Sequence, residues 1–241
     1  MALELVNVRP VVAKCKPDLT PDITALPFSD KTRLVVLVNP SNPTGYVWPQ
    51  DLVVELQRMC AERNVWLVSD EAYEEFLWDG AKHYSPVGDN VLNLYTLSKG
   101  FGMHGWRIGY CAYPPSLRPA LQKIQDTLII NACQFSQALA TECLRSHSDY
   151  PTKQLATLAD NRALVWDVVS AYPGTVKTPG AFYFFVKVRM IWCRAELVAA
   201  ASGWGSFRRG GVPLPREAAQ SVGNCGREYA HYFMGGPWLT E

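Results

Sequence analysis

The chain has 241 residues, of which 48% are hydrophobic, so it can form one large domain or about one and a half ordinary domains around a sizeable core. Its 23 Lys and Arg residues nearly balance its 22 Asp and Glu residues, so the charge gives no reason to expect a nucleic acid as a partner. The 7 cysteines are scattered without a CxxC pair, which argues against a disulfide framework and indicates a reducing compartment, which we take to be the cytoplasm.

The first elements are predicted from short apolar runs. Residues 9–15 (RPVVAKC) have the composition of a strand, and the Pro-rich stretch after them reads as a connection. A second strand is predicted over Leu34–Val38 (LVVLV), a β-branched run typical of a strand covered on both faces of a parallel sheet. It leads into NPSNPTG, where two Asn-Pro pairs and a glycine predict an ordered turn. A helix should run from Pro49 to a stop at Asn64, with apolar residues at helical spacing at Leu52, Leu56, Met59 and Cys60.

Two further apolar runs each end in a polar cluster. VWLV (65–68) runs into SDEAY, and VLNLY (91–95) runs into TLSK. With a helix between the first two of these strands, the pattern predicts a βαβ unit and an α/β fold with a mostly parallel sheet. Ligands of open α/β sheets bind beyond the carboxyl ends of the strands, so Asn42, Asp70 and Lys99 should converge on one crevice.

The second half of the chain is predicted to be mainly helical. A further strand is expected in IGYCAY, and helices are expected within 114–130, 134–145 and 151–170. TPGAFYFFVKV (178–188) has strand composition. After Arg189 there is no Lys, no Asp and no regular period, so no fold is assigned there. The prediction is therefore a partial large domain over 1–150, a connecting helix and the start of a small domain over 151–189, and a divergent tail over 190–241. This tail is either a disordered extension or the product of a reading frame other than the ancestral one.

The loop from Thr96 to Tyr110 (TLSKGFGMHGWRIGY) carries the chemistry. Lys99 lies just beyond a strand, and Arg107 follows it by eight residues. Three intervening glycines allow the backbone to turn tightly or to approach a ligand. An amine nucleophile and a bidentate anion-binding group are thereby placed on one turn.

The polar residues suit one small molecule that carries a pyridine ring, an aldehyde and a phosphate. The amine of Lys99 can form an imine with the aldehyde. Asp70 can keep the ring nitrogen protonated, which makes the ring a better electron sink. Asn42 and Tyr73 can donate to the phenolic oxygen. The phosphate suits the remaining two residues, Thr96 and Arg107.

NPSNPTG, SDEAYEEF and TLSKGFGMHGWRIGY follow one another in the order found in class I/II aminotransferases. The chain resembles this family of fold-type I pyridoxal-phosphate-dependent enzymes over about residues 1–188. The resemblance implies the α/β large domain of that fold, followed by an incomplete small C-terminal α/β domain. The stretch that begins WRIGYCAYPPSLRPALQ is most similar to a plant-type subgroup that acts on aromatic amino acids and methionine.

Carried over by position, the resemblance assigns the site residues. It makes Lys99 the catalytic residue, which forms a Schiff base with pyridoxal 5'-phosphate, and Asp70 the partner of the ring nitrogen. The other ligands of the cofactor would be Asn42, Tyr73, Thr96 and Arg107. No metal is expected, because His104 has no second His or Cys at ligand spacing.

Two departures from the family pattern leave the function open. Family members carry an N-terminal arm, a phosphate-cradling turn and a ring-stacking aromatic before the equivalent of Met1, so the chain reads as N-terminally truncated. The tail contains no Arg in the motif that binds the substrate carboxylate. The first hypothesis is an aminotransferase that moves an amino group between an amino acid and a 2-oxo acid. The alternatives are a non-catalytic fragment and a lyase such as aminocyclopropane-carboxylate synthase.

The expected partners are small molecules and a second subunit. The substrates would be an amino acid and a 2-oxo acid. The resemblance implies a homodimer with its sites near the subunit interface. No apolar stretch approaches the ~18 residues that cross a bilayer, so no membrane partner is expected.

Overall fold

The structure, a computed structural model, describes residues 6–16, 18–187 and 229–233. The chain divides into two compact units. The first holds most of the chain up to Gln154 and also Pro179–Ala181. The second holds Leu155–Thr178, Pro43–Gly45 and the described residues from Phe182 onward.

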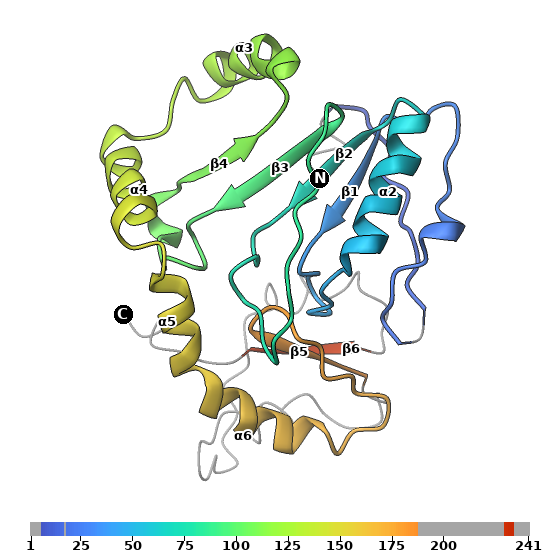
Figure 1. Cartoon of the computed structure of the whole chain (residues 1–241), viewed down its shortest axis with the longest axis vertical. Helices are drawn as coiled ribbons and strands as arrows, with labels where there is room; N and C mark the ends of the chain where they lie inside the picture. Colours follow the sequence, from blue (N-terminus) through green and yellow to red (C-terminus); the bar gives the residue numbers. More distant parts are fainter. Residues whose placement is uncertain (1–5, 17, 188–228, 234–241) are drawn as a thin grey trace, which may run out of the picture. The chain divides into compact units, whose positions relative to one another are not determined.

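A four-stranded sheet with the order β1-β2-β3-β4 forms the frame of the first unit (Figure 1). β1 (Leu34–Val38), β2 (Trp66–Asp70) and β3 (Val91–Thr96) run parallel, and β4 (Gly109–Ala112) runs antiparallel to β3. The prediction of an α/β fold with a mostly parallel sheet is confirmed. Each predicted polar cluster lies at the carboxyl end of its strand, although Asp70 is still the last residue of β2 and Thr96 the last residue of β3.

Helix α2 (Gln50–Glu62) connects β1 to β2 and covers one face of the sheet. Val53, Leu56 and Cys60 of the helix are buried, and they pack with apolar side chains of the strands. Burying each such side chain contributes about 1.5–3 kcal/mol. The buried stripe therefore runs through Val53, while Leu52 and Met59 of the predicted stripe lie at its margins and are half-buried.

The two faces of the sheet differ in how well they are covered. Leu37 and Leu67 are buried against α2, whereas Val36, on the other face, is 54% exposed. The prediction that β1 is covered on both faces is therefore wrong for the part of the chain that the structure describes. At the carboxyl ends of the strands, Val38, Asp70 and Leu94 pair in register, so Asp70 lies on the open face.

The loop after β3 is fixed by a second hydrophobic cluster. Leu97, Met103 and Ile108 of this loop are buried with Ala140 of α4 (Gln134–Ser146). The loop includes the short helix η2 (His104–Trp106). The loop after β3 is thus packed against α4, although it contains three glycines.

The remaining helices of this region were partly predicted. η3 (Pro115–Leu117) leads into α3 (Arg118–Leu128), whose apolar stripe is present but unburied, with Ile124 54% and Leu128 74% exposed. α5 (Tyr150–Thr157) and α6 (Ala159–Val169) replace the single helix predicted over 151–170. The break follows from Leu158, whose amide bonds to the carbonyl of Leu155, three residues back, in a tighter turn.

In the second unit, β5 (Tyr183–Lys187) pairs antiparallel with β6 (Tyr229–Phe233). Phe184 and Val186 of β5 are buried against Val169 of α6. β5 confirms the strand predicted within 178–188. β6 lies in the tail for which no fold was assigned, and most of that tail lies outside the described residues.

The strand predicted over residues 9–15 is wrong. This stretch forms only an isolated bridge between Cys15 and Pro21, and Val12 is 84% exposed. The connection that follows contains the short helix η1 (Ile23–Ala25), capped by the carboxylate of Asp22. Within the described ranges, no helix combines the length and apolar character that crossing a bilayer demands.

Candidate active site

The turn after β1 presents Asn42. The Asn39–Pro40 peptide bond is cis, and the amide of Ser41 donates to the carbonyl of Tyr46 at 2.8 Å, which closes the turn. Asn42 is exposed, and its Nδ2 donates to the hydroxyl of Tyr73 at 3.1 Å. This bond ties the segment after β1 to the segment after β2.

Asp70 is the last residue of β2, and three hydrogen bonds fix its backbone and its carboxylate. The amide of Asn39 donates to its carbonyl at 3.0 Å, and the next amide, that of Glu71, donates to the carbonyl of Leu94 at 2.9 Å. Its Oδ1 accepts from the amide of Ala72 at 3.1 Å. Because β1 and β3 both bind the backbone at Asp70, its carboxylate has a fixed position on the open face of the sheet.

Tyr73 brings three of the predicted residues together. The residue is 8% exposed, its hydroxyl accepts a hydrogen bond from Asn42, and the Nζ of Lys99 lies 5.7 Å from the centroid of its ring. That distance is within the range of a cation–π contact. The segments after β1, β2 and β3 therefore meet at this ring, as the parallel topology predicts.

Thr96 and Lys99 belong to one turn. The hydroxyl of Thr96 accepts from the amide of Ser98 at 3.1 Å and lies 2.9 Å from its hydroxyl. The amide of Leu97 donates to the carbonyl of Ile108 at 3.4 Å, which closes the base of the loop. Lys99 is half-buried on this turn.

The three glycines of the loop have different roles. Gly102 adopts a φ of 64°, in the left-handed region. A Cβ at Gly100 would meet Cγ of Pro151 at 3.3 Å, whereas a Cβ at Gly105 would meet nothing within 4 Å. Only Gly100 and Gly102 are therefore required by the backbone or its packing.

Arg107 is directed toward its own loop. It is exposed, has a φ of 52°, and its Nη1 donates to the carbonyl of His104 at 2.7 Å. Its backbone lies close to the site, because Gly109, two residues on, pairs with Thr96. The structure thus joins Asn42, Tyr73 and Lys99 by direct contacts and places Arg107 nearby with its guanidinium engaged elsewhere.

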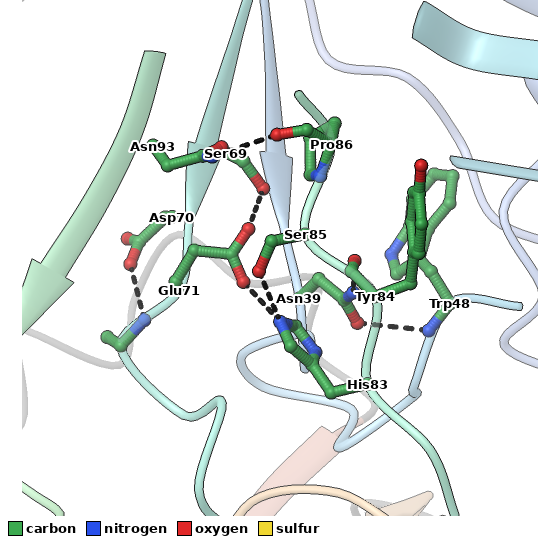
Figure 2. A network of polar contacts seen from close by, with 11 residues as sticks. Asn39, Trp48, Ser69, Asp70, Glu71, His83, Tyr84, Ser85, Pro86 and Asn93 are labelled. Carbon is green, nitrogen blue, oxygen red and sulfur yellow. Dashed lines mark hydrogen bonds and ion pairs between the residues drawn. The ribbon is translucent and has the colours of Figure 1, made fainter. Parts of the chain in front are cut away.

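A buried polar network beside Asp70 was missed by the sequence analysis (Figure 2). The hydroxyl of Ser69 donates to Oε1 of Glu71 at 2.6 Å, and Nε2 of His83 lies 2.5 Å from Oε2 of Glu71. Strand alternation places Ser69 and Glu71 on the face opposite Asp70, a signal that the sequence contains. His83 follows no period and could not be found in that way.

Glu74 lies close to this network. Glu71, Glu74 and His83 each offer a ligand atom, and these atoms lie within 4.8 Å of one another. The contact of His83 with Glu71 has the length of a hydrogen bond. Burial, together with the charges of Glu75 and Glu71, raises the pKa of Glu74 to about 7.

A small cavity of about 40 Å³ lies between the segment after β2 and the loop after β3. Its lining includes Glu71, Glu74, Glu75, Thr96 and Tyr110. Burial, together with the negative charge of Glu74, raises the pKa of Tyr110 to about 12. Three glutamate side chains therefore line this cavity together with Thr96.

Comparison with known proteins shows which family the chain resembles. The model of aminotransferase class I and II matches residues 5–201. An aromatic aminotransferase of Arabidopsis thaliana, ISS1, is 37% identical over 196 residues, which are 79% of this chain and 49% of that protein. An aspartate aminotransferase of Bacillus sp. (strain YM-2) is 32% identical over 169 residues, 67% of this chain and 43% of that protein.

Solved structures agree. An aromatic aminotransferase from Pyrococcus horikoshii OT3 has a TM-score of 0.73 and 29% sequence identity, over 78% of this chain and 54% of that chain. A double mutant of the aspartate aminotransferase of Thermus thermophilus has a TM-score of 0.70 and 26% identity, over 77% of this chain and 51% of that chain. The chain spans about half the length of the relatives it matches. Since the family model covers most of its residues, the chain belongs to the aminotransferase class I and II family.

Proposed function

We propose that this chain is the lysine-bearing part of a pyridoxal 5'-phosphate-dependent aminotransferase, which moves an amino group from an amino acid to a 2-oxo acid. The observation that carries the proposal is the meeting of Asn42, Tyr73 and Lys99 at the carboxyl ends of three parallel strands. The family membership supports it.

The donor set suits the cofactor. When bound, pyridoxal 5'-phosphate supplies an aldehyde for a primary amine and a ring that accepts the electron pair released at the substrate's α-carbon. Lys99 offers the amine, and Asp70 offers a carboxylate that stabilises a protonated ring nitrogen. Nδ2 of Asn42 donates to the hydroxyl of Tyr73, so the two groups lie side by side, and both would donate to the phenolic oxygen of the cofactor.

Lys99 would also move the proton. Its free amine would accept the proton from the substrate's α-carbon and would donate a proton again later in the reaction. The ring of Tyr73 attracts the ammonium form and so keeps the nitrogen over the site. Because Lys99 is half-buried, bulk water competes less for this amine.

Thr96 and Arg107 are proposed to hold the phosphate. The hydroxyl of Thr96 is fixed by Ser98 at the end of β3. The guanidinium of Arg107 has a neutral partner, the carbonyl of His104. A phosphate would replace that partner, since a charge-assisted bidentate contact is stronger than a bond to a carbonyl.

We propose aromatic amino acids as the first substrates to examine, because the Arabidopsis relative is named an aromatic aminotransferase. We also propose a homodimer in the cytoplasm. The exposed apolar side chains of α3 and of the residues after it are the kind of surface that subunits cover. The five described cysteines are free thiols, in keeping with a reducing compartment.

The test is a titration of the purified chain with pyridoxal 5'-phosphate, followed by absorbance, for the parent, Lys99→Ala and Lys123→Ala. Lys123 lies exposed on α3 and serves as the control. We expect the parent and the control to change the cofactor spectrum and Lys99→Ala to leave it unchanged. Equal spectra for all three would contradict the proposal.

A second step separates the three hypotheses. The cofactor-loaded chain is mixed with aromatic amino acids, methionine and aspartate, and the products are analysed. Release of the matching 2-oxo acid supports transamination. Cleavage of the substrate without an oxo-acid acceptor indicates a lyase, and binding without turnover indicates a non-catalytic fragment.

A further inference from the structure

Glu71 is a fully buried carboxylate next to Asp70. Its side chain has no exposed surface, and a buried carboxylate costs several kcal/mol unless it is hydrogen-bonded. Its two oxygens have different partners, the hydroxyl of Ser69 at 2.6 Å and Nε2 of His83 at 2.5 Å. We take Glu71 as the acceptor and Nε2 of His83 as the donor in this contact, and the same nitrogen also lies 3.2 Å from Oγ of Ser85. Glu71 is therefore satisfied by two donors on its own face of the sheet.

Asp70 and Glu71 point to opposite sides of the same backbone. Figure 2 shows the carboxylate of Glu71 directed at His83 and that of Asp70 directed away from it. Between them, the amide of Glu71 donates to the carbonyl of Leu94, and the amide of Ala72 donates to Oδ1 of Asp70. A displacement of Glu71 would shift both of these amides, and the second one holds the Asp70 carboxylate directly.

The segment that carries His83 is neither helix nor strand, but two of its carbonyls accept hydrogen bonds from buried side chains. Nδ2 of Asn39 donates to the carbonyl of Tyr84 at 3.2 Å, and Nδ2 of Asn93 donates to the carbonyl of Pro86 at 2.9 Å. Both asparagines are buried. The segment after His83 is thus bonded to the end of β1 and to β3, so the imidazole meets Glu71 from a fixed position.

We propose that Glu71 and His83 are a positioning pair that sets the orientation of the Asp70 carboxylate toward the ring nitrogen of the cofactor. Neither residue touches the cofactor. The pair anchors the first residue after β2 on the covered face, and the Asp70 carboxylate on the open face is aligned through the shared backbone. This inference rests on the proposed function, in which Asp70 faces the ring nitrogen.

Two substitutions of Glu71 by residues of similar volume test whether its side chain positions Asp70 or only fills space. Glu71→Leu fills the site but removes the carboxylate that contacts Ser69 and His83, so that Nε2 of His83 keeps only its contact with Oγ of Ser85. Glu71→Gln keeps the shape and two hydrogen-bonding groups, so it should restore the behaviour of the parent. Glu75→Leu is the matched control, because Glu75 is half-buried in the same segment and outside the network.

The first readout is the dissociation constant for pyridoxal 5'-phosphate and for an analogue in which carbon replaces the ring nitrogen. We expect Glu71→Leu to weaken binding of the natural cofactor about tenfold, the effect of one lost charge-assisted contact. Binding of the analogue should stay within about twofold, since it has no group for Asp70. Glu71→Gln and Glu75→Leu should resemble the parent for both. An equal loss for both compounds, or no loss, would overturn the inference.

The second readout needs no cofactor. Amide hydrogen exchange of the chain by NMR reports the bond from Ala72 to Oδ1 of Asp70. We expect Glu71→Leu to speed exchange at Ala72 about tenfold while Leu67, in the core, is unchanged. Unchanged exchange at Ala72 would refute the positioning pair even if the chain binds cofactor. If exchange changes but no variant, nor the parent, binds cofactor, the proposed function fails and the pairing stands.

Discussion

Nζ of Lys99 lies 5.7 Å from the centroid of the Tyr73 ring, and the hydroxyl of that ring accepts a hydrogen bond from Asn42. Residues separated by up to 57 positions are thereby joined at one aromatic side chain, where 57 is the difference between 99 and 42. The candidate site is therefore formed at the carboxyl end of the sheet by the segments after β1, β2 and β3, and not by one loop alone.

The bond between Asn42 and Tyr73 should be measurable as a coupling energy. Asn42→Ala and Tyr73→Phe each remove one partner, so the double variant should be less destabilised than the sum of the singles by about 0.5–1.5 kcal/mol. Urea unfolding of the four proteins gives the value. Ser136→Ala, which removes a distant bond to the carbonyl of Trp106, should be additive with Asn42→Ala. Additivity of Asn42→Ala with Tyr73→Phe would contradict the contact.

The glycines of the loop should differ in their tolerance of alanine. Gly102→Ala should cost about 1–2 kcal/mol because its φ is positive. Gly100→Ala should cost about 1 kcal/mol, since the new Cβ meets the rigid ring of Pro151. Gly105→Ala should change stability by less than about 0.5 kcal/mol. Thermal or urea unfolding tests the order, and a large loss at Gly105 would contradict it.

The raised pKa of Glu74 should make stability depend on pH. Its pKa is about 7 in the folded chain against an ordinary 4.5, so the folded state holds the proton that the unfolded state releases. This contribution is complete below pH 4.5 and is lost as the pH rises through about 7. The variant Glu74→Gln cannot ionise and so lacks this pH dependence. From pH 4.5 to about 7, its free energy of unfolding should therefore rise relative to that of the parent by about 1–2 kcal/mol, after allowance for solvent screening. Urea unfolding at several pH values tests this, and a difference that stays constant would contradict it.

The cysteines should differ in reactivity. Burial raises the pKa of the Cys60 thiol to about 11, whereas backbone hydrogen bonds from Ser136 and Phe135 lower the pKa of the exposed Cys133 thiol. Iodoacetamide at mildly alkaline pH should therefore modify Cys133 well before Cys60, because the thiolate is the nucleophile. Peptide mass spectrometry over time measures the order. Faster modification of Cys60 would show that the α2 core opens readily.

Much of the fold could be predicted because its signals are local. Short apolar runs bounded by Asn, Asp or Pro mark β1, β2 and β3, and a helix between the first two favours a parallel pair. That topology brings Asn42 and Lys99 to the ring of Tyr73, while the convergence of Asp70 on the same crevice stays a prediction. The division at about residue 150 stays a prediction.

The remaining features depend on contacts that no local pattern encodes. A β-branched run does not distinguish a strand covered on one face from one covered on both, so the exposure of Val36 could not be foreseen. His83 reaches Glu71 from an irregular segment. The direction of the Arg107 side chain depends on a left-handed backbone conformation that is uncommon for arginine.

The central claim is that Lys99 holds the cofactor, and reduction with borohydride tests it most directly. The chain is incubated with pyridoxal 5'-phosphate, reduced, digested and analysed by mass spectrometry. The account predicts one modified lysine, Lys99, at stoichiometric occupancy, with Lys123 unmodified. A label spread over surface lysines, or concentrated on a lysine other than Lys99, would contradict it.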